Sequence, residues 1–79
     1  MDTIIRTRIT ILQAFNDEAL TQGDLVRKLN MDPEDVHTHL QKLIDLELLE
    51  DKIEEEIHRY YLKKEAESKV DLMIKSFKS

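Results

Sequence analysis

The sequence has no cysteine, no tryptophan, one glycine and one proline among its 79 residues. The lack of cysteine excludes a disulfide scaffold and any metal site built on thiolates. So few glycines and prolines leave too few turns for an all-β sandwich. A hydrophobic fraction of 41% is also too high for a disordered chain. The composition therefore predicts a mainly helical folded protein.

Long hydrophobic runs are missing as well. No run approaches the roughly 18 apolar residues needed to span a bilayer, and the amino terminus lacks a signal-peptide pattern. We therefore expect a soluble cytoplasmic protein with no membrane partner. A chain of 79 residues forms one small domain. Such a domain buries only about 60% of its unfolded surface, so dimerisation is the expected source of added stability.

The apolar spacing in the first part of the chain predicts a helix over about residues 3–16. Its two apolar stripes make an arc wider than one small core requires, which fits either a central helix or a second subunit on its outer face. A connector at residues 17–20 follows, with a short strand at Ala19–Leu20. Thr21 and Asp24 then form a capping-box pattern for a second helix, and Asn30 suits its left-handed end.

The strongest helix start in the sequence lies at Asp32, which is predicted to cap. Pro33 fits the first helical position, and Glu34 and Asp35 favour the positive helix end. The inward stripe of this helix comprises Val36, Leu40, Leu43 and Ile44. Two helices separated by about three residues predict a helix-turn-helix over residues 21–46.

Two β-capable segments, residues 48–53 and 57–62, are joined around Glu54–Glu56. They predict a two-stranded ribbon, or wing, over residues 48–62, with Tyr60 and Leu62 on its inner face. A last helix over residues 64–78 carries an apolar stripe. The fold class is therefore mainly α with a small β-hairpin: a winged helix-turn-helix with an additional C-terminal helix, forming a single domain over residues 1–79.

Three segments carry a family resemblance. They are Val36-His37-Thr38-His39-Leu40-Gln41-Lys42-Leu43, Leu48-Leu49-Glu50 and Tyr60-Tyr61-Leu62. In this order they resemble the ArsR-like winged-helix regulators of small archaeal and bacterial type. The resemblance implies a DNA-binding transcriptional regulator that acts as a homodimer, with the last helix used for dimerisation.

The chain departs from that family pattern at three places. Glu47 stands where a glycine usually precedes the wing, and Glu54–Glu56 form a wing tip that relatives make basic or glycine-rich. The metal-sensing cysteines of some relatives are absent, so neither a metal site nor a cofactor is expected. We find no phosphate loop and no nucleophile motif, and we expect no enzyme activity.

Double-stranded DNA is the expected partner, and phosphate contacts need lysine and arginine. His37 and Thr38 occupy the family positions that commonly touch DNA, and glutamine can bridge adenine. The predicted DNA-binding residues are Thr21, Gln22, His37, Thr38, Gln41, Lys42, Lys52 and Arg59. The predicted dimer interface comprises Ile4, Ile11, Phe15, Val70, Met73, Ile74 and Phe77.

An alternative rests on the excess of negative charge. The segment Asp32–Asp45 holds four acids and one lysine, and the whole chain has a net charge of −5. Such a surface also suits a winged helix that binds a basic protein and no DNA. His37 and His39 point to different sides of the helix, so they cannot bind one metal ion together. His39 aligns with a family histidine next to the inner stripe and is expected to pack or hydrogen-bond. His58 is a candidate for a pH-sensitive salt bridge on the wing.

Overall fold

The computed structural model describes residues 3–15 and 18–78. The elements, in chain order, are α1 (Thr3–Ala14), β1 (Leu20–Thr21), α2 (Gln22–Leu29), α3 (Pro33–Asp45), β2 (Leu49–Glu54), β3 (Ile57–Leu62), the 3-10 turn η1 (Lys64–Ala66) and α4 (Glu67–Lys78). This order confirms the winged helix-turn-helix with an additional C-terminal helix. The predicted helix end at Asn16 and the connector residue Asp17 lie outside the described residues.

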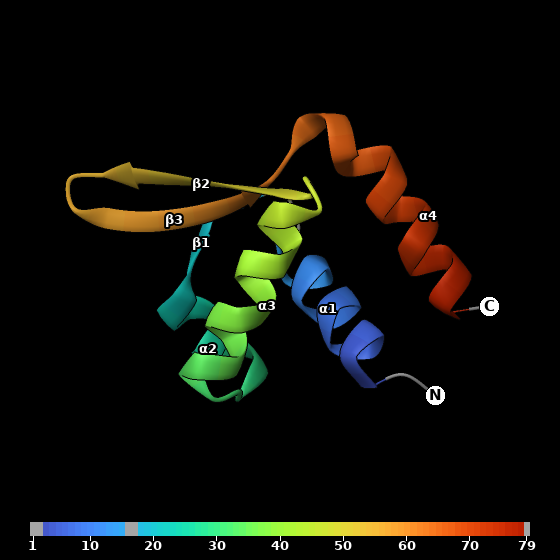
Figure 1. Ribbon diagram of the computed structural model, residues 1–79, viewed down its shortest axis with the longest axis horizontal. Coiled ribbons are helices and arrows are strands. Elements are labelled where there is room, and N and C mark those ends of the chain that lie inside the picture. Colours follow the sequence, from blue (N-terminus) through green and yellow to red (C-terminus); the bar gives the residue numbers. More distant parts are fainter. Residues whose placement is uncertain (1–2, 16–17, 79) are drawn as a thin grey trace.

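The ribbon of β2 and β3 extends to one side of the helices, and α1 and α4 lie toward the other (Figure 1). Its strands are antiparallel, with a register that runs from Leu49 opposite Leu62 to Glu54 opposite Ile57. β1 pairs with the other edge of β3. Within the described residues the sheet is therefore three-stranded, in the order β1-β3-β2. The predicted short strand is confirmed, one residue later than expected.

The wing turn consists of Glu55 and Glu56, which have φ angles of 50° and 68°. A two-residue hairpin loop with positive φ at both positions is of the type I′ kind, which asparagine and glycine adopt most easily. The sequence contains neither residue here. The turn therefore holds Glu55 and Glu56 in a left-handed conformation that is unfavourable for residues other than glycine and asparagine.

Pro33 lies in the first turn of α3, as predicted. Proline is tolerated there because the N–H that it lacks would have no acceptor within the helix. The expected side-chain cap is wrong. Asp32 occupies the N-cap position, but its side chain makes no capping hydrogen bond. Glu34 and Asp35 remain in the first turn, where their charges complement the helix dipole.

The end of α3 closes through two backbone hydrogen bonds. The Glu47 N–H donates to Ile44 O at 2.9 Å, and the Leu48 N–H donates to Leu43 O at 3.0 Å. This pair is a Schellman motif, which needs a left-handed residue at Glu47, and its φ is 62°. Because Leu48 closes the helix, β2 begins at Leu49 and not at Leu48 as predicted.

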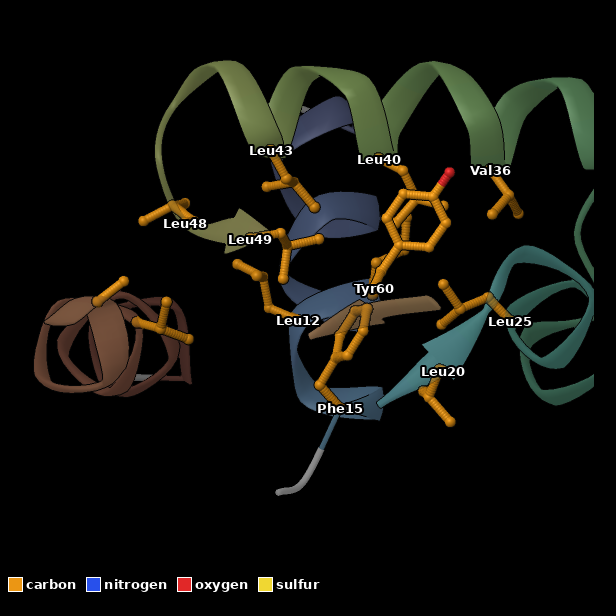
Figure 2. Packing of buried hydrophobic residues seen from close by; sticks show 13 residues of the cluster. Leu12, Phe15, Leu20, Leu25, Val36, Leu40, Leu43, Leu48, Leu49 and Tyr60 are labelled. Atoms are coloured by element: carbon orange, nitrogen blue, oxygen red, sulfur yellow. The ribbon is translucent and has the colours of Figure 1, made fainter. Parts of the chain in front are cut away.

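The core lies between the inner face of the sheet and the helices. Val36, Leu40 and Leu43 point from α3 toward Tyr60 and Leu49 of the sheet (Figure 2). The Tyr60 side chain is 2% exposed, and burial, together with the nearby Asp51 carboxylate, raises the pKa of its phenol above the ordinary value. The inner stripe predicted for α3 is confirmed, with Ile44 packed at its margin.

Three residues assigned from the sequence to a dimer interface also belong to this core. Ile11 and Phe15 have no exposed surface, and Val70 is 2% exposed. They bury their side chains within a single chain, because α1 is covered by elements on more than one side. Their burial is thus explained within one chain, and their contact with a second subunit stays a prediction.

Candidate nucleic-acid interface

The helix-turn-helix begins with a reciprocal cap on α2. The Asp24 N–H donates to Thr21 Oγ1 at 3.1 Å, and the Thr21 N–H donates to Asp24 Oδ2 at 3.0 Å. The predicted capping box is therefore confirmed. The bond from the Thr21 backbone is the main cause that lowers the pKa of Asp24 below its ordinary value. At the other end of α2, Asn30 has the predicted left-handed conformation, with φ of 52°.

A side chain of α2 links it directly to the start of α3. The Gln22 Nε2 donates to the Pro33 carbonyl oxygen at 3.0 Å. This bond uses one of the two N–H donors of the amide, and Gln22 is only half-buried. Gln22 thus fixes the turn between the helices while part of its amide still faces solvent. The half-buried Thr21 likewise has a structural task, which limits it as a contact for DNA.

The exposed face of α3 is the most distinctive part of the candidate interface. Residues spaced four and three apart share one side of a helix, since a turn has about 3.6 residues. One such row lies opposite the buried Val36, Leu40 and Leu43, and all its members are exposed. This row, which we call the outward row, consists of Glu34, Thr38, Gln41 and Asp45.

The predicted contacts His37 and Lys42 are also exposed, and they lie on either side of the outward row. The structure thus brings His37, Thr38, Gln41 and Lys42 onto one accessible surface. Glu34 was not in the predicted set of contacts, although the helical spacing of the sequence already places it on the outward side of this helix.

His39 lies between the exposed face and the core. It is half-buried, and its Nδ1 has no hydrogen-bond partner among the residues that the structure describes. The half-buried position of His39 therefore fits a packing role, in agreement with the sequence interpretation. The interpretation also allowed a hydrogen bond, and none is formed at Nδ1 within the described parts of the chain.

The wing presents the two predicted basic residues side by side. Lys52 is directly opposite Arg59 in the β2–β3 register, so their side chains share one face of the ribbon. Tyr60 faces the core, and side chains alternate along a strand, so this face points away from the core. The Lys52 Nζ lies 3.9 Å from Glu54 Oε2, which offsets part of its charge.

The other face of the wing carries His58. Its Nε2 lies 2.7 Å from Asp51 Oδ2, and its ring stacks on that of Tyr60 with a centroid distance of 4.6 Å. The acidic partner expected for His58 is thus identified as Asp51. This contact joins the two strands near the point where the wing leaves the core.

Charge is divided unevenly between the two sides of the molecule. Residues 20–62, which form the helix-turn-helix and the wing, contain eleven acidic and five basic residues. The helices α1 and α4 contain five basic and two acidic residues. In addition, Arg27 Nη2 lies 2.7 Å from Asp24 Oδ1. The surface that would approach DNA thus has little uncommitted positive charge.

A groove between α1 and α4 exposes apolar surface. It has a volume of about 490 Å³ and is lined by Ile5, Ile9, Lys69, Leu72, Met73, Ser76 and Phe77. Ile5 is 47% exposed and Leu72 is 65% exposed. The Arg6 guanidinium carbon lies 5.9 Å from the centre of the Phe77 ring. Of the predicted dimer residues, Met73 and Phe77 line this groove, and Ile4 is exposed close to it in α1.

Within residues 3–15 and 18–78, no cluster of three or more histidine or acidic side chains could hold a metal ion. None of the helices in those residues is long and apolar enough to cross a membrane.

A helix-turn-helix followed by an antiparallel ribbon defines the winged-helix fold. The chain belongs to the arsR family of bacterial regulatory proteins, whose model matches residues 6–51. No curated protein gives a significant match to the sequence.

Several solved structures have a fold similar to that of this chain. The transcriptional regulator HlyU of Vibrio vulnificus is similar over 86% of this chain and 72% of its own, with 25% identity and a TM-score of 0.75. ZitR of Lactococcus lactis is similar over 84% of this chain, with 23% identity and a TM-score of 0.75. This chain spans 47% of the ZitR chain. The MepR–DNA complex of S. aureus matches 99% of this chain and 62% of its own, with 16% identity and a TM-score of 0.66.

Proposed function

We propose that this protein binds specific sequences of double-stranded DNA as a homodimeric transcriptional regulator. The outward row of α3 carries the proposal. It places Thr38 and Gln41, with His37 beside them, on the side of a recognition helix opposite the core. Threonine and glutamine can form hydrogen bonds with base edges in the major groove. Family membership supports the same function.

In this function α3 enters the major groove, and the wing lies against the DNA backbone. Lys42 on α3 and the Lys52–Arg59 pair on the wing provide positive charge for phosphate contacts. Thr21 and Gln22, at the start of α2, contact the DNA backbone. Their hydrogen bonds within the protein leave only part of their hydrogen-bonding capacity for these contacts. The likeness to a solved MepR–DNA complex is consistent with this docking.

Dimerisation through α1 and α4 completes the proposal. The groove between these helices exposes Ile5 and Leu72, and a second copy would cover both. Two copies related by a two-fold axis would present their α3 helices to half-sites about 34 Å apart. Dimerisation would also add buried apolar surface to a small core.

The direct test is selection of bound duplexes from a random pool, followed by binding assays over a range of salt concentrations. Affinity for the selected duplex should fall steeply as salt rises, because phosphate contacts release counterions. Gln41→Ala should relax the preference for one base pair, whereas Lys42→Ala should weaken binding to all sequences about equally. If the wild-type protein binds no duplex at low salt, the DNA-binding proposal is wrong, and the alternative of a basic protein partner for the acidic surface is favoured.

A further inference from the structure

The hydroxyl of Thr38 is committed to its own helix. Its Oγ1 lies 3.0 Å from the backbone carbonyl oxygen of Glu34. The carbonyl oxygen can only accept, so the threonine hydroxyl must donate its single proton to it. Toward solvent, Thr38 then offers lone pairs alone. It can accept a hydrogen bond from a ligand but has no proton left to donate.

Glu34 has the same limitation for a different reason. Its side chain is exposed and lies in the outward row, one turn before Thr38. An ionised carboxylate is an acceptor only. The stretch from Glu34 to Gln41 rises about 10 Å along the helix, which corresponds to roughly three base pairs. Glu34 and Thr38, the first two outward residues in this stretch, can therefore form hydrogen bonds only with donors on the surface opposite them.

The major groove offers few donors. They are the exocyclic amino groups of cytosine (N4) and adenine (N6), whereas guanine and thymine present acceptors on this edge. Adenine also carries the acceptor N7 beside its amino group, which would repel a carboxylate. Cytosine has no acceptor beside N4 on this edge, so it suits Glu34, whereas the neutral Thr38 oxygen suits either amino group.

We infer that Glu34 and Thr38 are specificity-determining residues that read exocyclic amino groups, and that Glu34 reads the N4 amino group of a cytosine. This inference rests on the proposed DNA-binding function and deepens it. It also gives the acidic recognition helix a role. Glu34 repels the backbone of every duplex, and only a correctly placed amino group offsets that repulsion, so wrong sequences are rejected.

A simpler role for Glu34 is to stabilise the positive end of α3. Asp35 provides a matched control, because it has the same charge, lies in the same helical turn and is exposed, but is not part of the outward row. Removing either carboxylate should slightly raise affinity for arbitrary duplexes by reducing repulsion. Only the loss of Glu34 should change which base pair is preferred.

The experiment compares selections from a random duplex pool with wild-type protein, Glu34→Ala, Asp35→Ala and Thr38→Val. One C·G pair should lose its preference in Glu34→Ala but keep it in Asp35→Ala. A neighbouring preference for adenine or cytosine should weaken in Thr38→Val. Thermal unfolding of all four proteins shows that the variants are folded.

A chemical substitution then identifies the group that is read. Replacing the cytosine with pyrimidin-2-one, which lacks the N4 amino group, should weaken wild-type and Asp35→Ala binding at least about tenfold. The same replacement should cost Glu34→Ala less than about twofold, because the acceptor is already gone. Replacing the paired guanine with 7-deazaguanine should have little effect on any of them.

Three results would overturn the inference while leaving DNA binding intact. The first is an unchanged base preference in Glu34→Ala. The second is a preference that Glu34→Ala loses at an A·T pair instead of a C·G pair. The third is a loss of wild-type affinity with 7-deazaguanine instead of with pyrimidin-2-one. A wild-type protein that binds no duplex at low salt would overturn the proposed function and the inference together.

Discussion

Thr21 and Asp24 exchange hydrogen bonds across the start of α2, each side chain accepting from the backbone N–H of the other at 3.0–3.1 Å. The pair satisfies two N–H groups that a helix start leaves unpaired. It also fixes the short strand β1 to α2, because Thr21 is the last residue of one and the cap of the other. The pair therefore helps to set the orientation of α2 relative to the sheet, together with the buried Leu25 of α2.

The first prediction concerns the pH dependence of this cap. Because the pKa of Asp24 is lowered from 3.8, its stabilising effect is full above that value and is lost as pH falls through the lower folded-state pKa. Asp24→Asn should thus be less stable than wild type at pH 6, and the gap should narrow below pH 3.8. Urea unfolding at several pH values measures the gap. A gap that is the same at pH 6 and pH 3 would contradict the assignment. Thr21→Ala should cost about 1 kcal/mol at neutral pH.

The second prediction concerns Glu47, which holds the left-handed position that ends α3, with φ of 62°. A residue with a Cβ pays about 1 kcal/mol or more in this conformation, and glycine does not. Glu47→Gly should therefore raise the free energy of unfolding by roughly 0.5–1 kcal/mol. Glu47→Ala is the control, since alanine keeps the Cβ and should bring no such gain. Equal stability of the two variants in chemical unfolding would show that the conformation carries no cost.

The third prediction separates charge from conformation at the wing tip. Glu55→Asn with Glu56→Gly supplies the residues that a type I′ turn favours and removes two charges. Glu55→Gln with Glu56→Gln removes the same charges but leaves the turn unfavourable. Unfolding measurements should show a gain of stability in the first double variant only. Binding to a selected duplex at low salt should tighten in both. A gain in affinity confined to the Asn-Gly variant would mean that turn geometry, not charge, limits DNA binding.

Local signals in the sequence predicted most of the helix-turn-helix. Pro33, the Thr21–Asp24 pair and Asn30 act through neighbouring backbone groups, so their effect does not depend on the rest of the fold. The wing boundaries were harder to predict. Leu48 reads as a strand residue, but its N–H closes α3. The turn at Glu55 and Glu56 is imposed by strand pairing, against the preference of its residues.

Burial could not be assigned to one subunit or two from periodicity alone. Ile11 and Phe15 form an apolar stripe that fits either a core or a subunit interface, and the spacing of apolar residues is the same in both cases. Only the packing of the sheet and of α4 against α1 shows that they are covered within one chain. The hydrogen bond that commits the Thr38 hydroxyl is also invisible in the sequence, because threonine in a helix can adopt more than one rotamer.

The fourth prediction concerns the proposed dimer. Ile5→Glu or Leu72→Glu places a charge in the apolar groove between α1 and α4, which burial would then penalise. Each variant should sediment as a monomer at concentrations at which the wild-type protein is a dimer. Ile53→Glu is the matched control, because Ile53 is 68% exposed on the wing, away from the groove. This variant should remain dimeric.

Salt should act on dimerisation and on DNA binding in opposite directions. The helices α1 and α4 carry a formal charge of +3, and Lys69 lines the groove. Two copies joined there bring like charges together, and salt screens that repulsion. Sedimentation equilibrium should thus show tighter dimers at 0.5 M than at 0.05 M salt, a range in which DNA affinity falls. Dimers that weaken as salt rises would instead indicate an interface between the acidic wing side of one copy and the basic helices of another.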